Sequence, residues 1–193
     1  MTKQIRHKEN TLAVALGANL PSWAGTPSQT LIKVRPFLEF EILNWVKSEE
    51  KKRSRNHENS LEVYWKWSPL FESDPVGGPD KQPVYINAVL VVEGESLSSI
   101  DPSEIKANSL LKRLLLIENH FGRDRSKGDI KWGPRTLDID LLAWGELQVK
   151  NEELTLPHPR LLQRSFVIAP LAAILSSKEK AARRIPPQNG WKE

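Results

Sequence analysis

The chain has 193 residues, of which 39% are hydrophobic and 27% are charged. This length fits one domain that can bury a core, and the composition excludes a disordered chain. The absence of cysteine excludes a disulfide framework, a thiolate zinc site and a cysteine nucleophile. The net charge of +4 suits a polyanionic ligand, either a nucleotide or a nucleic acid, without separating the two.

No membrane-spanning or secretory segment is expected. The longest apolar stretch, residues 166–175, is too short to cross a bilayer and contains Pro170. The first ten residues lack the apolar region of a signal peptide. We therefore expect a soluble cytoplasmic protein without a membrane partner, and we take it to be a monomer.

Hydrophobic patterning predicts the first elements. Residues 11–17 form a short apolar run typical of a buried strand, and a turn signal follows it. Between residues 28 and 47 apolar side chains recur every three or four positions, which predicts a helix that Pro36 kinks or breaks. Residues 47–60 are dense in charge, which predicts an exposed loop or a frayed helix end.

Two more strands are predicted in the middle of the chain. Residues 61–67 alternate in polarity, which is typical of a strand with one buried face. Residues 68–83 are rich in proline and glycine and predict a loop. Residues 84–93 are strong β-formers and predict a strand.

A second helix is predicted from a start signal at Asp101. Asp101 would cap the helix, with Pro102 at its first position and Glu104 in its first turn. Leucines recur at helical spacing after it, and Gly122 marks the end.

The last third of the chain adds one strand and short elements. Residues 135–145 predict a strand, residues 149–157 a shorter extended piece, and residues 160–177 a short helix. Residues 178–193 form a polar tail with prolines, for which we expect partial disorder. The order βαββαβ predicts an α+β fold of the ferredoxin-like type, an antiparallel sheet with helices on one face. We expect a single domain whose core covers residues 11–175.

Asp138 and Asp140 are the sharpest candidates for chemistry. They lie two apart in a run that otherwise consists of leucine and isoleucine, so both carboxylates face the same side of a strand. Two like charges there are costly unless something neutralises them, and Mg²⁺ prefers carboxylate oxygens. A solvated polar face is the alternative, and the pair taken by itself does not decide between the two.

Basic residues just before this strand favour the magnesium interpretation. Arg123, Arg125 and Arg135 lie there, and Lys127 and Lys131 are better explained as surface charges. Cations beside a metal-binding carboxylate pair are typical of phosphoryl-transfer sites. No Walker A motif is present, which argues against a P-loop kinase.

Several ordered motifs carry a resemblance to a known family. The most specific is Trp-Gly-Pro-Arg-Thr-Leu-Asp-Ile-Asp at residues 132–140, preceded by Gly-Arg-Asp-Arg at residues 122–125. The others lie at residues 15–20, 68–87 and 156–166. Together they resemble the 6-hydroxymethyl-7,8-dihydropterin pyrophosphokinases of folate biosynthesis, and the resemblance covers residues 11–175.

The resemblance implies transfer of pyrophosphate from ATP to the hydroxymethyl group of the pterin, with release of AMP. It implies that Asp138 and Asp140 hold two Mg²⁺ ions that bridge the triphosphate of ATP, the co-substrate. Arg123 and Arg135 would contact the moving phosphates. The resemblance places five more residues on the ATP side: Glu118, Arg125, Trp132, His158 and Arg164.

The resemblance also implies a pterin site. Asn87 would read the pterin edge, because a side-chain amide offers both donors and an acceptor. Tyr85 and Phe166 would stack on the flat ring, and the backbone around Ser73 and Val76 would complete the edge. Without the resemblance, core packing is the better explanation of the two aromatic rings.

Two alternatives belong to other classes. A ferredoxin-like RNA-binding module has the same topology, but its usual sequence motif is absent and two carboxylates on the sheet would repel phosphate. A catalytically inactive relative kept for protein binding is disfavoured by the retained aspartates and arginines. We therefore expect small-molecule substrates and no nucleic-acid partner.

Overall fold

The computed structural model describes most of the chain. The described residues are 10–53, 61–125, 132–159, 161, 168–171, 174 and 183–191. The elements in chain order are β1 (Leu12–Ala18), α1 (Pro27–Arg53), β2 (Tyr64–Trp67), β3 (Phe71–Ser73), β4 (Tyr85–Glu93), α2 (Glu95–Ser98), α3 (Glu104–His120), β5 (Asp138–Trp144), β6 (Val149–Lys150), β7 (Thr155–Leu156) and β8 (Arg183–Arg184).

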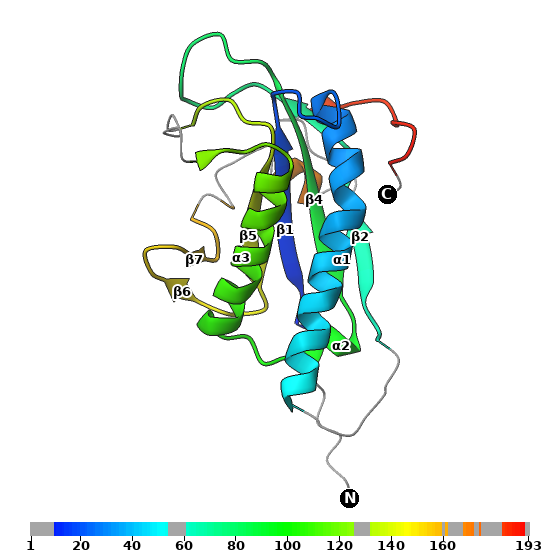
Figure 1. Ribbon diagram of the computed structural model, residues 1–193, viewed down its shortest axis with the longest axis vertical. Coiled ribbons are helices and arrows are strands. Elements are labelled where there is room, and N and C mark those ends of the chain that lie inside the picture. The colour runs from blue at the N-terminus through cyan, green and yellow to red at the C-terminus, as the bar shows by residue number, and fades with distance from the viewer. Residues whose placement is uncertain are drawn as a thin grey trace, which may run out of the picture.

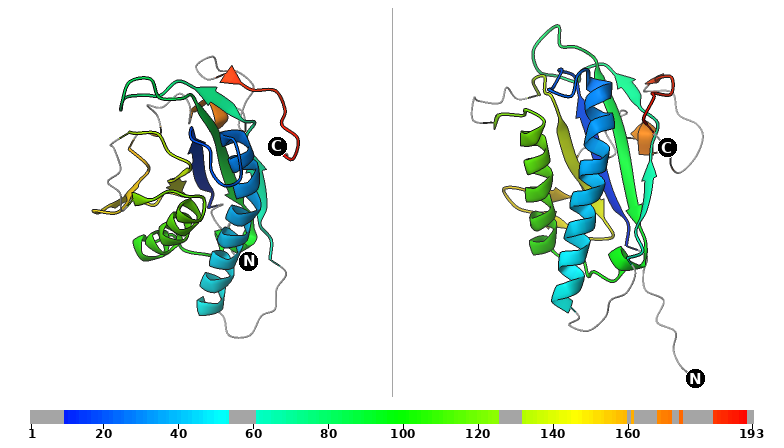
Figure 2. Two further views of the ribbon diagram at one scale, coloured as in Figure 1. Left: turned by 45° about the horizontal axis from the view of Figure 1, so that its top comes forward. Right: turned by 45° about the vertical axis from the view of Figure 1, so that its right-hand side comes forward.

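An antiparallel sheet runs through the centre of the molecule. Its strand order is β5-β1-β4-β3-β8, and β2 also pairs with β4. The helices α1 and α3 lie side by side on one face of the sheet (Figures 1 and 2). This arrangement confirms the predicted α+β fold, with β1, α1, β2 and β3, β4, α3 and β5 in the βαββαβ order. Among the described residues, no helix is long and apolar enough to cross a membrane.

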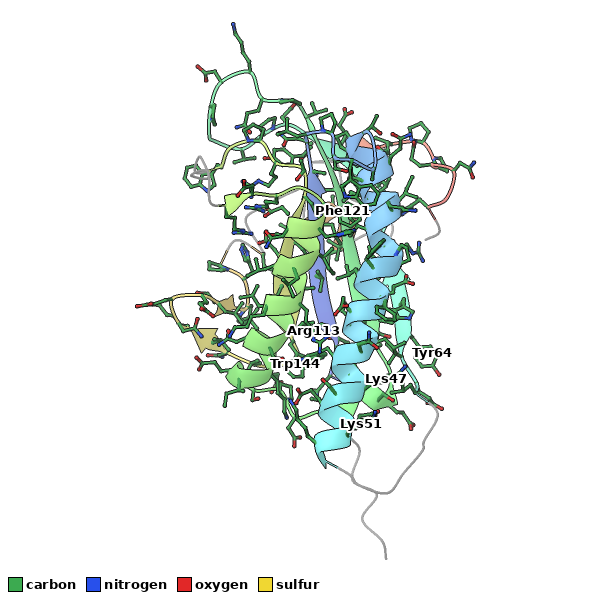
Figure 3. The ribbon with its side chains drawn as sticks, viewed as in Figure 1. Lys47, Lys51, Tyr64, Arg113, Phe121 and Trp144 are labelled. Atoms are coloured by element: carbon green, nitrogen blue, oxygen red, sulfur yellow. The ribbon has the colours of Figure 1, made fainter. Side chains whose placement is uncertain are left out.

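Most of the core lies between the sheet and these two helices. Leu16 of β1 and Ile139 of β5 face this layer, and Leu38 of α1 is fully buried in it. The rings of Trp45 and Trp144 meet edge to face with centroids 5.1 Å apart, and Figure 3 shows Trp144 near the lower ends of the helices. Each large side chain buried in this way contributes about 1.5–3 kcal/mol.

The opposite face of the sheet, which we call the back face, carries a smaller buried cluster. The cluster consists of Ala15, Val89, Val91 and Leu142, with Leu161, Leu171 and Ile174 packed against it. The helical residues 168–171 and 174 therefore cover the middle of the back face. In the rest of the segment predicted to be a short C-terminal helix, Leu161 lies in a turn and the other residues lie outside the described part of the chain.

The first helix decides two points that its prediction left open. It continues through Pro36 without a break, because Leu31, Val34 and Leu38 around the proline are all fully buried against the sheet and offset the lost backbone hydrogen bond. It also extends to Arg53, so residues 47–53 are the end of a helix, the second of the two predicted alternatives, and not an exposed loop.

Three element boundaries also differ. Residues 71–73, predicted to be loop, form β3. The strand β2 begins at Tyr64 and not at residue 61, because the carbonyl of Glu62 accepts a hydrogen bond from the backbone N–H of Ser96 at 3.2 Å instead of pairing in the sheet. The helix α3 begins at Glu104 with Ser103 at its N-cap, so the predicted cap at Asp101 is two residues too early.

The C-terminal tail returns to the sheet. The strand β8 pairs with β3, and the ring of Trp191 meets the ring of Trp67 at 5.0 Å between centroids. The expectation of partial disorder is therefore wrong for residues 183–191. The predicted extended piece at residues 149–157 is the hairpin of β6 and β7.

Candidate active site

The strands β4, β1 and β5 bring the predicted site residues together. In the register of the sheet, Gly17 lies between Asn87 and Asp138, and Ala15 lies opposite Asp140. Paired residues on neighbouring strands point to the same face, and Ala15 belongs to the back-face cluster. The two aspartates therefore share the back face, as their spacing predicts, and Asn87 shares it with them.

The short strand β3 extends this arrangement at the other edge of β4. Ser73 pairs with Tyr85, and Phe71 pairs with Asn87. The amide nitrogen of Asn87 donates to the hydroxyl of Ser73 at 3.0 Å, and only 3% of Asn87 is exposed. Three of the five predicted pterin residues thus lie next to one another across β3 and β4.

Two arginines hold Asp138. The guanidinium of Arg123 donates to Oδ1 of Asp138 and, at 3.2 Å, to the carbonyl of Leu137. Arg135 donates to Oδ2 of Asp138 at 2.8 Å. Burial alone would raise the pKa of Asp138, but the charges of Arg135 and Arg123 outweigh it and lower this pKa below its ordinary value. Asp138 is therefore ionised in the folded protein at neutral pH.

Glu118 connects the last turn of α3 to these arginines. Its side chain is 1% exposed, and its Oε1 accepts the backbone N–H of Ile139 at 2.7 Å and Arg123 at 3.3 Å. Its Oε2 accepts a hydrogen bond from Arg125. Burial raises the pKa of Glu118, while the charge of Arg123 opposes that rise. The buried carboxylate of Glu118 thus fixes the positions of two arginines relative to the strand β5.

Asn19 is a site residue for which no role was predicted, although it lies in the motif at residues 15–20. It is 2% exposed, and its Oδ1 accepts the backbone N–H of Arg135 at 2.7 Å. Its Nδ2 donates to the carbonyl of Pro83 at 3.1 Å. The signal in the sequence is an asparagine directly after a predicted apolar strand. If the fold buries its side-chain amide, that amide needs hydrogen-bond partners. Asn19 links the segments that precede β4 and β5.

The loop before β4 and the loop before β5 contact each other at the site. Gln82 donates from Nε2 to the carbonyls of Gly77 and Trp132, both at 3.0 Å. The backbone of Trp132 has a φ of 59°, and a side chain on Gly78 would collide with the Trp132 carbonyl. The hydroxyl of Tyr85 donates to the Gly133 carbonyl at 3.0 Å, and burial raises the pKa of this hydroxyl. No role was predicted for Gln82.

The remaining predicted residues divide into two groups. Val76 is 69% exposed in the loop before β4. His158 is partly buried, and its backbone N–H donates to the carbonyl of Leu142 at 2.7 Å, which places it beside β5. Arg164 and Phe166 lie outside the described residues, as do residues 126–131.

The carboxylates fit magnesium only together with a phosphate ligand. Among the described residues, no three side chains of His, Asp or Glu come together as a metal cage, and arginines hold both Glu118 and Asp138 in the structure. Mg²⁺ usually binds one or two carboxylates and takes its other ligands from water and substrate phosphates. Asp138 and Asp140, on one face of β5, match that donor set.

Comparison with known proteins supports this assembly. The family model described as 7,8-dihydro-6-hydroxymethylpterin-pyrophosphokinase matches residues 13–176. A Bacillus subtilis protein named 2-amino-4-hydroxy-6-hydroxymethyldihydropteridine pyrophosphokinase is 37% identical over 126 residues, which are 65% of this chain and 68% of the relative. Proteins of the same name from Synechocystis and Haemophilus influenzae are 43% and 41% identical over 55% and 56% of this chain, and the matched parts are 48% and 60% of their own lengths.

Proposed function

The chain belongs to the 7,8-dihydro-6-hydroxymethylpterin-pyrophosphokinase family, and on that premise we propose that it transfers pyrophosphate from ATP to 6-hydroxymethyl-7,8-dihydropterin in folate biosynthesis. Release of AMP means that the hydroxymethyl oxygen bonds to the β-phosphorus of ATP. The bond from that phosphorus to the α,β-bridging oxygen breaks, the electron pair leaves with AMP, and the hydroxyl proton is lost.

One observation carries the proposal. Asn87 and Asp138 lie on one rung of the sheet with only Gly17 between them. Neighbouring strands are about 4.8 Å apart, so a flat ring read by Asn87 has its substituent close to Asp138. Such an arrangement supports a transfer in which the pterin hydroxyl meets the phosphates of ATP over β5.

The arginines supply the phosphate side. Arg123 and Arg135 now hold Asp138, and Arg125 holds Glu118. Arginine binds phosphate oxygens with the same fork of donors that it offers to a carboxylate. We infer that the triphosphate takes over these donors and that Asp138 then becomes available as a metal ligand. Two Mg²⁺ ions bound by Asp138 and Asp140 would neutralise charge on the phosphates.

The assignment of individual residues follows the same division. Arg123, Arg135, Asp138 and Asp140 serve the transfer, Glu118, Arg125, Trp132, His158 and Arg164 serve ATP binding, and Ser73, Val76, Tyr85, Asn87 and Phe166 serve pterin binding. Glu118 contributes by holding Arg123 and Arg125, since its carboxylate is buried. We propose that a single domain with its core at residues 11–175 carries this activity as a cytoplasmic monomer.

RNA binding is not supported as an alternative. An RNA-binding module of this topology stacks bases on aromatic residues of its exposed sheet face. Here the back face carries Asp138 and Asp140 where that face would meet phosphate, and the relatives named above are pyrophosphokinases.

The decisive experiment follows the label of ATP. The protein is incubated with Mg²⁺, 6-hydroxymethyl-7,8-dihydropterin and ATP labelled at either the α- or the γ-phosphorus. We expect the α-label in AMP and the γ-label in the pterin product, with no turnover when the pterin is omitted. Labelled ADP in place of AMP would overturn the pyrophosphoryl assignment.

A further inference from the structure

The C-terminal residues 183–191 lie beyond the part of the chain that the family model matches, yet they contact the edge of the pterin site. Figure 1 shows this red segment beside the upper end of α1, where a side chain on Gly190 would meet Ile32 at 3.2 Å. We call residues 183–191 the C-terminal strap.

The strap binds the outer side of residues 68–72. Its strand β8 pairs with β3 in the register Phe71 with Arg184 and Glu72 with Arg183. The backbone N–H of Ile185 donates to the carbonyl of Leu70 at 3.0 Å. Phe71 and Glu72 of β3 are therefore paired on both sides, with β4 and with the strap.

Trp191 anchors the strap. Its Nε1 donates to the carbonyl of Ser68 at 2.9 Å, and its ring meets Trp67 edge to face. The guanidinium of Arg35 lies 5.0 Å from the ring centroid of Trp67 and 5.5 Å from that of Trp191. A strand of two residues is too short to hold by itself, so these contacts keep the strap in place.

The strap lies next to the contact between Ser73 and Asn87. Ser73 is the last of the three residues of β3, directly after the two that pair with β8. Its hydroxyl accepts the amide of Asn87 at 3.0 Å, which orients the group proposed to read the pterin. Without the strap, β3 would be a three-residue edge strand held on one side only, and such edges open readily.

We propose that the C-terminal strap positions β3, and through Ser73 the amide of Asn87, for pterin binding, with Trp191 as the positioning residue. This inference rests on the pyrophosphokinase function proposed above. It predicts an effect on pterin binding but not on ATP binding. The strap contacts the pterin edge of the sheet, and none of its described contacts reaches Arg123, Arg135 or Asp138.

The test compares Trp191→Ala, Trp191→Phe and Trp23→Ala in the full chain. Trp23 is a matched control, since its Nε1 also donates to a backbone carbonyl, that of His120 at 2.8 Å, and its ring stacks on Phe121. Calorimetry measures the Kd of ATP, and the Kd of 6-hydroxymethyl-7,8-dihydropterin in the presence of an unreactive ATP analogue. Hydrogen exchange compares the amides of β3 with those of β5.

For Trp191→Ala we expect the Kd of the pterin to rise about tenfold, as for loss of a hydrogen bond with its packing, while the Kd of ATP stays within twofold. The amides of β3 should exchange faster and those of β5 should not. Trp191→Phe, which keeps a ring against Trp67, should recover part of the affinity, and Trp23→Ala should leave the Kd of the pterin unchanged.

Two results would overturn the inference. One is a Trp191→Ala protein that melts earlier but binds the pterin as the unmodified protein does, which would make the strap a stabilising element only. The other is equal weakening of both substrates. Failure of the proposed function itself would look different, because the unmodified protein would then bind no pterin or release no AMP.

Discussion

Asn87 and Asp138 lie on the same rung of the sheet, on either side of Gly17. The residue between them has no side chain, so no side chain separates Asn87, proposed to bind the pterin, from Asp138, proposed to serve the phosphates. A Cβ atom on Gly17 would lie 3.3 Å from Oδ1 of Asn87 and 3.8 Å from the ring of Tyr85. That spacing is tighter than an ordinary contact on the Asn87 side, and Asn87 is buried and tied to Ser73.

Gly17→Ala should therefore weaken pterin binding without stabilising the fold. The added methyl group pushes on Oδ1 of Asn87, so we expect the Kd of the pterin to rise several-fold while the Kd of ATP is unchanged. Replacing a strand glycine by alanine reduces the entropy of the unfolded chain, which alone would add about 0.4–1 kcal/mol to the free energy of unfolding. The tight contact with the buried Asn87 opposes this gain, so we expect the free energy of unfolding to stay close to that of the unmodified protein. Calorimetry and urea unfolding measure the two effects, and a parallel loss of both would contradict the prediction.

Asn87→Ala should remove pterin binding selectively. The substitution deletes the side-chain amide that is proposed to bind the pterin edge and leaves Ser73 without its amide partner. Polar groups left unpaired in a buried site cost about 1–3 kcal/mol, so the Kd of the pterin should rise ten- to a hundredfold. ATP binding, measured on the same protein, is the internal control. A matching loss of ATP affinity would indicate a folding defect.

Glu118→Gln should weaken ATP binding without opening the fold. Glutamine keeps an oxygen for the backbone N–H of Ile139 but removes the charge that holds Arg123 and Arg125. The arginines would then lose their fixed positions. The Kd of ATP should therefore rise and the turnover number should fall.

The control for this substitution is Glu49→Gln. Glu49 is also a buried carboxylate, 3% exposed and paired with Lys52 at 2.6 Å, but it lies near the end of α1 and not at the candidate site. It should leave the Kd of ATP unchanged. Equal effects of the two variants on ATP binding would show that the contacts of Glu118 with Arg123 and Arg125 do not determine the affinity for ATP.

The part of the site that lies on one strand could be predicted from the sequence. A strand alternates its side chains with a period of two, so the position of Asp138 and Asp140 on one face follows from their spacing alone. The buried strand β1 likewise follows from a short continuous run of apolar residues, and the helix α3 from apolar residues at helical spacing.

Contacts between distant segments could not be predicted in this way. Asn19 and Arg135 are 116 residues apart in sequence, and no local pattern pairs them. The strands β3 and β8 have three and two residues, which is too short for any period to show. They exist because each finds a partner strand, and the sheet that supplies those partners forms only in the folded chain.

Asp138→Asn should abolish turnover and also lower stability, with a pH dependence of known sign. The pKa of Asp138 is lowered in the folded protein because Arg135 and Arg123 hold its charged form. A depressed carboxylate pKa stabilises the fold above the pKa of the unfolded state, about 3.9, and this contribution is lost as the pH falls through the lower, folded value. The unmodified protein should therefore be more stable than Asp138→Asn at pH 7, by about 1–3 kcal/mol as for hydrogen bonds to a charged group.

The difference in the free energy of unfolding between the unmodified protein and Asp138→Asn should decrease as the pH drops below about 4, where the carboxylate takes up a proton in the unfolded chain. Urea unfolding from pH 7 to pH 3 measures it. Turnover with Mg²⁺ and ATP should fall by orders of magnitude, because the Mg²⁺ proposed to bind Asp138 would supply several kcal/mol of charge stabilisation. Asp140→Asn is the companion variant, since it tests the second carboxylate on the same face of β5. An Asp138→Asn protein that keeps near-normal turnover would remove Asp138 from the transfer step, and a stability gap that stays constant with pH would show that the two arginines do not hold its charge.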